Sequence, residues 1–486
     1  MTEHSDFSPR RRAMLAALAA AGAGSSMGVS MSASAARALR MGAQRKVSAT
    51  GGGERRISQL IGANGWPVTE ANAAMWKAMG ITWGRDSVGP GQRHSADDPV
   101  EVDKTGAAFD HDLPPAILLN NRHGIHSLLL LGYTPKWNAS VDGDSRSAPK
   151  DDSVWQRYVE AVVRMYVAPP YNVRHFQVWN EAAGKLTGGA PQATFWHGKH
   201  FSANREQARP YDRAMQDYVE LVHVPAARII RKYGGYVVYG GWPDQGGLDN
   251  YIRWLEYRSP VVNARMIDWV DYLDTHYLGV DALTPLYDRY VANGSVRGIW
   301  QTEIGDRYMI DPHYLPMYFF KFAVWALDHT WDDPNKYVSM VYHWDGFEPF
   351  RLTHRGNPRT YNVSGKSLIV LNKTVGGPLE RFGGHLTFSP DASGLALRSG
   401  SDLVIQVRAG PGPRTVNVSG WSGAEPARLG VAMIDALTGE AADPSAITAH
   451  ASPDGLSIGF RIPEAVNGTR HGAPAHLAYL VISGQA

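Results

Sequence analysis

The sequence predicts an α/β fold, a (β/α)8 TIM barrel followed by a small all-β sandwich domain. Between about residues 57 and 355, short apolar runs alternate with helical segments, and this alternation gives eight candidate strands. After about residue 360 the helical periodicity ends, and short alternating segments at 401–408, 414–421, 456–463 and 476–483 are separated by Gly, Pro and Asp turns. The second pattern is typical of a β-sandwich.

The eight predicted barrel strands lie within residues 57–65, 81–89, 123–135, 175–181, 236–243, 266–279, 297–305 and 337–347. Apolar residues recur at helical spacing in the intervening segments 69–80, 154–166, 211–234 and 315–329. A doubly wound sheet is the structural alternative. No Gly-rich phosphate-binding turn follows the first strand, which favours the barrel.

The N-terminal residues predict an export signal over residues 1–36. Arg10, Arg11 and Arg12 precede a mild Ala/Leu stretch and then small residues, a pattern that resembles a twin-arginine signal. The alternative is a disordered basic tail. Residues 37–55 are a predicted linker, 56–358 the barrel and 359–486 the sandwich. We therefore expect an exported protein, periplasmic or secreted, with no segment that spans a membrane.

The overall composition excludes several functions. The net charge is +2 and the basic residues are scattered, so charge gives no reason to expect nucleic acid or an anionic membrane as a partner. The chain has no Cys, which excludes a disulfide framework, a thiolate metal site and a Cys nucleophile. No HExxH-type metal-ligand spacing and no GxSxG elbow occurs, and we expect neither a metal nor a cofactor.

Two glutamates fall at the ends of predicted strands. Glu181 ends the fourth strand and Glu303 the seventh, and in a (β/α)8 barrel such residues face one active-site mouth. Two carboxylates about 5 Å apart suit retaining glycoside hydrolysis, in which one is a protonated acid and the other an ionised nucleophile. The alternative for either residue alone is a salt-bridged glutamate at a strand end.

The motifs around these glutamates resemble glycoside hydrolase clan A. VWNE before Ala182, GITWGRDSV, GYTPKW and WQTEIG are most similar to family 39, and the resemblance covers roughly residues 57 to 355. It implies that Glu181 is the acid/base and Glu303 the nucleophile. It further implies that Asn180 binds the sugar 2-OH and that Arg85 keeps Glu303 ionised, unless Arg85 is merely a surface arginine.

The sixth strand departs from the clan pattern. His276 matches the clan's active-site histidine, which many members follow two residues later with a tyrosine that orients the nucleophile. This chain has Leu278 at that place and Tyr277 one residue earlier. Either Tyr277 replaces the usual tyrosine from a shifted backbone, or the contact is missing.

Tryptophans lie at or just beyond the predicted strand ends, namely Trp66, Trp83, Trp137, Trp196, Trp242 and Trp344. Sugars present apolar C–H faces that stack on indole rings, whereas the alternative for each Trp is ordinary core packing. We expect Trp137, Trp196 and Trp344 to bind substrate. The aperiodic segment 182–210 is predicted to be a functional loop on the leaving-group side.

These observations predict an exported retaining β-glycoside hydrolase that acts on a polysaccharide or its oligosaccharides. The resemblance makes β-xylosides, α-iduronides and exopolysaccharides candidate substrates, and the export signal favours a bacterial exopolysaccharide. A non-catalytic carbohydrate-binding protein and a transglycosylase are the alternatives. The sequence leaves open endo or exo action and the oligomeric state. It favours a buttressing role for the C-terminal domain over glycan binding.

Overall fold

The computed structural model of the chain describes residues 54–88, 113–183, 195–199, 213–242, 247–305, 311–344, 351–420, 429–452 and 455–484. The predicted export signal and nearly all of the predicted linker lie outside these residues, as does most of the segment predicted to be a functional loop. Within the described residues, no helix is long and apolar enough to cross a bilayer.

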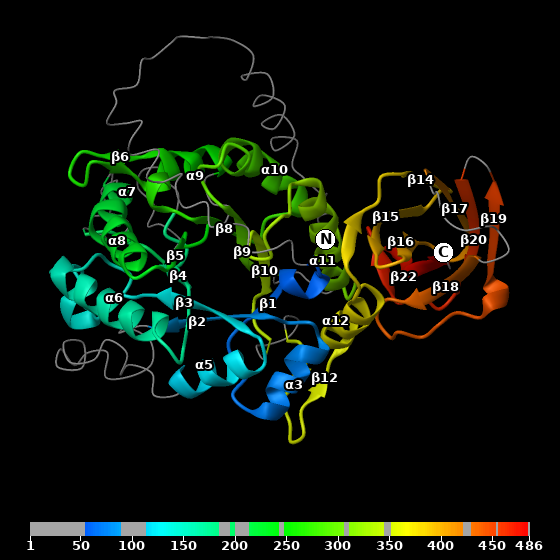
Figure 1. Cartoon of the computed structure of the whole chain (residues 1–486), viewed down its shortest axis with the longest axis horizontal. Coiled ribbons are helices and arrows are strands. Elements are labelled where there is room, and N and C mark those ends of the chain that lie inside the picture. The colour runs from blue at the N-terminus through cyan, green and yellow to red at the C-terminus, as the bar shows by residue number, and fades with distance from the viewer. Residues whose placement is uncertain are drawn as a thin grey trace, which may run out of the picture. The chain divides into compact units, whose positions relative to one another are not determined.

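The predicted barrel is present (Figure 1). Eight parallel strands close in the order β1-β10-β9-β8-β5-β4-β3-β2 within the described residues. Their bounds are β1 Ile61–Asn64, β2 Trp83–Val88, β3 His126–Leu131, β4 His175–Val178, β5 Tyr236–Val238, β8 Tyr272–His276, β9 Gly298–Ile304 and β10 Tyr337–Val341. All eight lie inside the segments that the sequence predicts as strands. The first is shorter than expected, because Ile57–Leu60 form a 3₁₀ turn.

The two ends of the barrel interior differ in chemistry. One cluster of buried apolar side chains comes from strands all around the barrel: Trp83, Leu128, Val238, Tyr272, Trp300, Val338 and Met340. Polar side chains are buried on the barrel strands closer to their C-terminal ends, among them Arg85, Gln177 and Thr302. A buried polar group is unfavourable unless it is hydrogen-bonded, so these residues mark the functional end.

Helices surround the strands (Figure 1). Those outside the sandwich are α3 Glu70–Ala78, α5 Leu113–Arg122, α6 Asp152–Val167, α7 Ala214–Asp217, α8 Val224–Lys232, α9 Gly247–Glu256, α10 Thr284–Leu286, α11 Tyr314–Asp328 and α12 Val363–Thr374. The helix predicted over 211–234 is interrupted by a π segment, Tyr218–His223. Pro225 follows in the first turn of α8, where its missing N–H is tolerated.

Helix α12 is a correction, since the sequence pattern predicts no helix after about residue 360. Asn362 caps it by accepting a hydrogen bond from the Gly365 N–H at 3.0 Å. Its buried Leu368 and Leu371 are three residues apart, on one face. The run of apolar residues 368–371 resembles a short buried strand as well as a helix, so periodicity alone missed it.

The C-terminal part is the predicted β-sandwich. One sheet holds β13 Leu379–Arg381, β15 Ala392–Ser399, β16 Asp402–Ala409, β22 Ala473–Gly484 and β18 Leu429–Asp435, with β21 Gly468–Arg470 paired to β22. The other holds β14 His385–Phe388, β17 Gly412–Ser419, β20 Gly455–Ile462 and β19 Ile447–Ser452. Two small hairpins lie earlier in the chain, β6 Arg258–Ser259 with β7 Ala264–Arg265, and β11 Thr353–His354 with β12 Thr360–Tyr361.

The sandwich has a core of its own and is also joined to the barrel. Side chains such as Ile405 and Phe460 pack between its two sheets. Across to α11, Gln406 Nε2 donates to the Pro316 carbonyl at 3.0 Å. The ring of Tyr479 on β22 lies 6.1 Å from that of Phe320. The sandwich therefore contributes to the packing around α11.

Candidate active site

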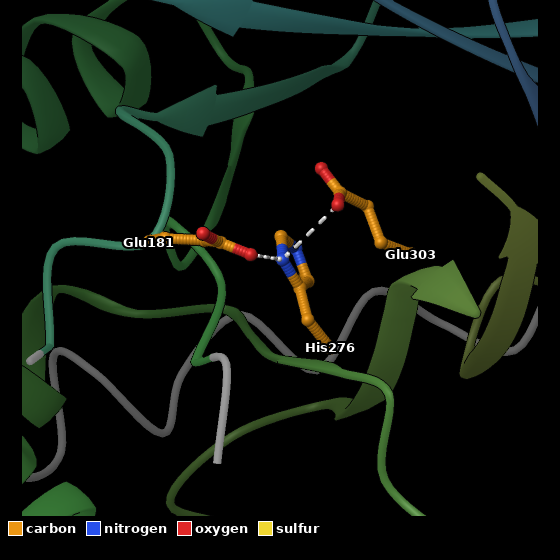
Figure 2. A group of neighbouring side chains, drawn as sticks. All are labelled: Glu181, His276 and Glu303. Carbon is orange, nitrogen blue, oxygen red and sulfur yellow. Dashed lines mark hydrogen bonds and ion pairs between the residues drawn. The ribbon is translucent and has the colours of Figure 1, made fainter. Parts of the chain in front are cut away.

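The two glutamates predicted from the sequence lie together at the C-terminal end of the barrel (Figure 2). Glu181 follows β4 and Glu303 lies on β9, and their exposed fractions are 9% and 8%. One carboxylate oxygen of Glu181 lies within 4.8 Å of one of Glu303. Retaining glycosidases hold their carboxyl groups about 5–5.5 Å apart and inverting enzymes about 6.5–9.5 Å apart. The observed separation fits the retaining arrangement.

His276 lies between the two carboxylates, as the sticks in Figure 2 show. Its Nδ1 is 2.8 Å from Glu181 Oε1 and 3.7 Å from Glu303 Oε2. The ring is fully buried, and burial alone would lower its pKa. The neighbouring negative charges, Glu303 first among them, outweigh burial and raise the pKa of His276 to about 10. The surrounding carboxylates therefore favour the imidazolium form of His276.

Glu303 is held as a carboxylate. Its Oε1 accepts a hydrogen bond from Arg85 Nη1 at 2.8 Å, and its Oε2 accepts one from the Tyr277 hydroxyl at 2.5 Å. Burial would raise the pKa of Glu303, but the cations His276 and Arg85 and the Tyr277 hydrogen bond together lower it. An ionised, oriented carboxylate can act as a nucleophile.

Tyr277 reaches Glu303 although it stands one residue earlier than the clan pattern places a tyrosine. The pairing of β8 with β9 shifts register between Asp274 and His276. Tyr277 then adopts the left-handed region, with φ 58°. These two local irregularities turn its side chain towards Glu303. The arrangement corresponds to the alternative in which Tyr277 replaces the usual tyrosine from a shifted backbone.

Arg85 also connects to the other side of the site. Its Nη2 donates to Asn180 Oδ1 at 2.6 Å, and its Nη1 donates to Asn64 Oδ1 at 2.8 Å. Asn64 ends β1, and its amide donates to the Val341 carbonyl at 2.8 Å. No sequence motif singles out Asn64. A polar residue at the end of the first strand was the signal that could have found it.

Three non-glycine residues at this end of the barrel have left-handed backbone: Trp179 with φ 69°, Glu181 with φ 46° and Tyr277. Such conformations cost about 1–3 kcal/mol each and persist where the surrounding structure enforces them. Glycines provide the necessary space, because a Cβ at Gly240 would lie 2.4 Å from the Val178 carbonyl oxygen. One at Gly241 would lie 2.4 Å from His276 Nε2.

Two of the three tryptophans expected to bind substrate, Trp196 and Trp344, are buried. Trp196 is fully buried, and its Nε1 donates to the Ala214 carbonyl at 2.7 Å. Trp344 is 4% exposed, and the Arg359 guanidinium lies 4.8 Å from the centre of its ring. Trp137 is half-buried against the core. This burial favours the packing alternative for Trp196 and Trp344.

Two tyrosines lie near the glutamates, and the sequence analysis did not name them. Burial raises the pKa of Tyr133. The cation Arg85 opposes this increase, and the carboxylates Glu303 and Glu181 add to it. Tyr342 follows β10 and is half-exposed, and its ring centre lies 6.3 Å from that of Tyr277. Its pKa is raised by burial and then by Glu303 and Glu181. Tyr342 directly follows β10 and Tyr133 stands two residues after β3, and this placement was the available signal.

Within the described residues, Glu181, His276 and Glu303 are also close enough together to surround a metal ion. Both oxygens of Glu303 already accept hydrogen bonds, one of them from the cation Arg85. His276 is likewise cationic, and a protonated imidazole is not a metal ligand. The arrangement fits proton exchange better than metal coordination.

Comparison with known proteins supports the fold. No family model and no curated protein matches the chain. A solved family 39 glycoside hydrolase from the gut symbiont Bacteroides cellulosilyticus WH2 is 12% identical, with TM-score 0.51, covering 88% of this chain and 82% of that one. A family 30 endoxylanase from Clostridium papyrosolvens C71 is 15% identical, with TM-score 0.54, covering 90% and 98%.

A family 30 subfamily 8 xylanase from Clostridium acetobutylicum is similar in the same way. It is 12% identical, with TM-score 0.52, and covers 89% of this chain and 97% of that one. At these identities the likeness establishes a shared fold. The predicted resemblance to such hydrolases is therefore confirmed for the fold, and the chemistry has to be argued from the site.

Proposed function

We propose that this protein is an exported retaining β-glycoside hydrolase acting on a polysaccharide or its oligosaccharides. The observation that carries the proposal is the buried pair Glu181 and Glu303, with oxygens within 4.8 Å of each other. Among the residues that the structure describes, a guanidinium and a tyrosine hydroxyl are bonded to Glu303 and not to Glu181. This asymmetry suits two carboxyl groups with different roles.

In the first step, a carboxylate oxygen of Glu303 attacks the anomeric carbon and the glycosidic C–O bond breaks. Glu181 gives its proton to the departing oxygen. In the second step, Glu181 takes a proton from water, whose oxygen attacks the anomeric carbon and releases Glu303. Both displacements invert the anomeric centre, so the product keeps the configuration of the substrate.

The neighbouring residues have roles that follow from their contacts. Asn180, whose Oδ1 accepts from Arg85, keeps its amide N–H₂ to donate to the sugar 2-OH. A hydrogen bond there strengthens in the oxocarbenium-like transition state. Arg85 and Tyr277 keep Glu303 ionised and oriented. Because both are buried or partly buried, little solvent screens their effect.

The proposed substrate and location rest on the sequence pattern and on analogy. The twin-arginine-like signal favours an enzyme that works outside the cytoplasm, and a bacterial exopolysaccharide is the favoured substrate among β-xylosides, α-iduronides and exopolysaccharides. The assignment to exopolysaccharide rests on analogy with the family, because fold alone does not specify a substrate.

The test is reducing-end release from a panel of β-linked bacterial exopolysaccharides and xylans by the wild type and by Glu303→Gln. We expect release by the wild type and a loss of at least about 10³-fold in the variant, as for removal of a nucleophile. Product sizes then distinguish endo from exo action. Longer glycans formed at high substrate concentration would indicate a transglycosylase. Silence from both proteins with intact glycan binding would instead support a non-catalytic binder.

A further inference from the structure

A chain of buried polar side chains runs through the barrel interior and connects the two glutamates. In order, its members are Glu303, Arg85, Gln177, Asp274, His276 and Glu181. Arg85 Nε donates to Gln177 Oε1 at 2.6 Å, and Gln177 Nε2 donates to Asp274 Oδ2 at 2.5 Å. Gln177 and Asp274 are fully buried. Asp274 lies two residues before His276 on β8, and neither step of the proposed double displacement uses it.

Asp274 accepts several hydrogen bonds and is surrounded by donors. Its Oδ1 accepts from the Thr302 N–H at 2.9 Å, and its Oδ2 accepts from the Thr302 hydroxyl at 2.7 Å. His276 Nε2 lies 3.0 Å from that hydroxyl and 3.5 Å from Asp274 Oδ2. Because the hydroxyl hydrogen points to Asp274, Thr302 Oγ1 accepts from His276 Nε2, which must therefore carry a proton.

The charges of this network balance in only one way that suits the proposed reaction. Arg85 and His276 are cations, while Glu303 and Asp274 are anions, so the group is neutral when Glu181 holds its proton. Burial would lower the pKa of Arg85, but Glu303 and then Asp274 raise it overall. An unbalanced buried charge is strongly unfavourable. Without the negative charge of Asp274, loss of a proton from His276 would become more favourable.

We propose that Asp274 is a positioning residue that acts through Thr302 to hold the His276 imidazolium against Glu181 and to balance its charge. This inference rests on the proposed glycosidase function for its kinetic consequence. The part that concerns the protonation of His276 depends only on the network itself. Asp274 touches no substrate and acts through Thr302 and His276.

The titratable groups that face His276 are Glu181 after β4, Glu303 on β9, Asp274 on its own strand β8 and Tyr277 directly after it. From the side of β5, Gly241 packs against the ring and carries no charge. The carboxylates Glu303 and Asp274 both favour the protonated imidazole, and Glu181 does so only while it is ionised. Among these carboxyl groups, the two glutamates face Nδ1 of the His276 ring and Asp274 faces its Nε2.

The first arm of the test is NMR titration of the ¹⁵N-labelled histidines in the wild type and in Asp274→Asn. The His276 signals are assigned by their absence in His276→Gln. We expect the wild-type ring to stay doubly protonated well above pH 7, and its titration to move down by about one to three pH units in Asp274→Asn. Titration of wild-type His276 near pH 6.5, or no difference in the variant, would overturn the proposal.

The second arm is kinetic and uses Asp271→Asn as the matched control. Asp271 lies at the opposite, N-terminal end of β8, where it accepts from Arg231 Nη2 at 2.9 Å. The probes are phenyl and 2,4-dinitrophenyl β-glycosides of whichever sugar the wild type releases. For Asp274→Asn we expect kcat/KM to fall about 10²-fold with phenol, which needs a proton, and less with dinitrophenol. The alkaline limb of its pH profile should move to lower pH.

The two arms separate the two proposals. If the wild type releases no sugar from the glycan panel, the glycosidase proposal fails, while the titration still decides the protonation of His276. Equal losses with both leaving groups, or the same losses in Asp271→Asn, would reduce Asp274 to a structural residue. If Asp274→Asn does not fold, Thr302→Val removes the linking hydroxyl and should lower the titration of His276 in the same direction.

Discussion

At the scale of single residues, Tyr277 shows how a local irregularity can substitute for a sequence motif. Its hydroxyl donates to Glu303 Oε2 at 2.5 Å from a position one residue earlier than the clan pattern. The sequence identified this residue and two alternatives for it: either Tyr277 contacts the glutamate from a shifted backbone, or the contact is missing. It could not decide between them, because the outcome depends on a register shift between two strands that no local pattern encodes.

Tyr277→Phe tests this contact. The hydroxyl helps to lower the pKa of Glu303, so its loss should raise that pKa, and the acidic limb of the pH profile of kcat/KM should move to higher pH. We expect a fall in kcat/KM of about 10-fold or more at neutral pH. Tyr287→Phe, which loses only an exposed contact with Thr330, is the control. An unchanged acidic limb in Tyr277→Phe would contradict the assignment.

Tryptophan placement was the least predictable part of the site. Strand-end position correctly located the glutamates, Arg85 and His276, because the ends of barrel strands converge. It says nothing about which way an indole points, since that depends on packing partners far along the chain. Trp196 contacts Trp179 and Tyr218 edge-on and is buried between them. Asn64, Tyr133 and Tyr342, at similar strand ends, were overlooked for lack of a motif.

At the scale of elements, the segment after β5 controls the position of His276. Gly241 has φ 80°, and its missing side chain leaves room for the imidazole ring. The sequence predicted the strand and the glycine pair within 236–243. It did not indicate that the second glycine packs on an active-site histidine, because that contact joins β5 to β8 through the fold.

Gly241→Ala should therefore damage the site more than the fold. The added Cβ would lie 2.4 Å from His276 Nε2 and would strain a left-handed backbone. We expect kcat/KM to fall about 10²-fold through misplacement of His276. Gly294→Ala is the matched control, because Gly294 also has left-handed backbone, with φ 76°, and a Cβ there meets nothing within 4 Å. Comparable activity of the two variants would contradict this role of Gly241.

At the scale of the whole molecule, the barrel and the sandwich share packing. The sequence predicted both parts because their apolar periodicities differ. It missed α12, whose apolar run is ambiguous. The barrel and the sandwich belong to one compact unit, Ser48–Ala486. Tyr479 on β22 belongs to the same buried cluster as Phe320 and Leu371 of the helices. This supports a buttressing role for the sandwich.

Tyr479→Ala tests the buttress. Removing a fully buried aromatic side chain should lower the free energy of unfolding by about 3–5 kcal/mol, measured by chemical denaturation. At low temperature kcat/KM should stay close to that of the wild type, because the residue lies away from the glutamates. Phe460→Ala, within the core of the sandwich alone, is the comparison. Loss of glycan binding with unchanged stability in Tyr479→Ala would instead indicate a binding domain.

The central claim is that Glu181 and Glu303 carry out a double displacement across a short gap. The most direct measurement is ¹H NMR of the anomeric proton of the first product released from a β-linked substrate. Oxygens within 4.8 Å of each other leave too little space for a sugar ring and an attacking water together between acid and base, so we expect the β-anomer first, followed by slow mutarotation. Release of the α-anomer first would contradict the account.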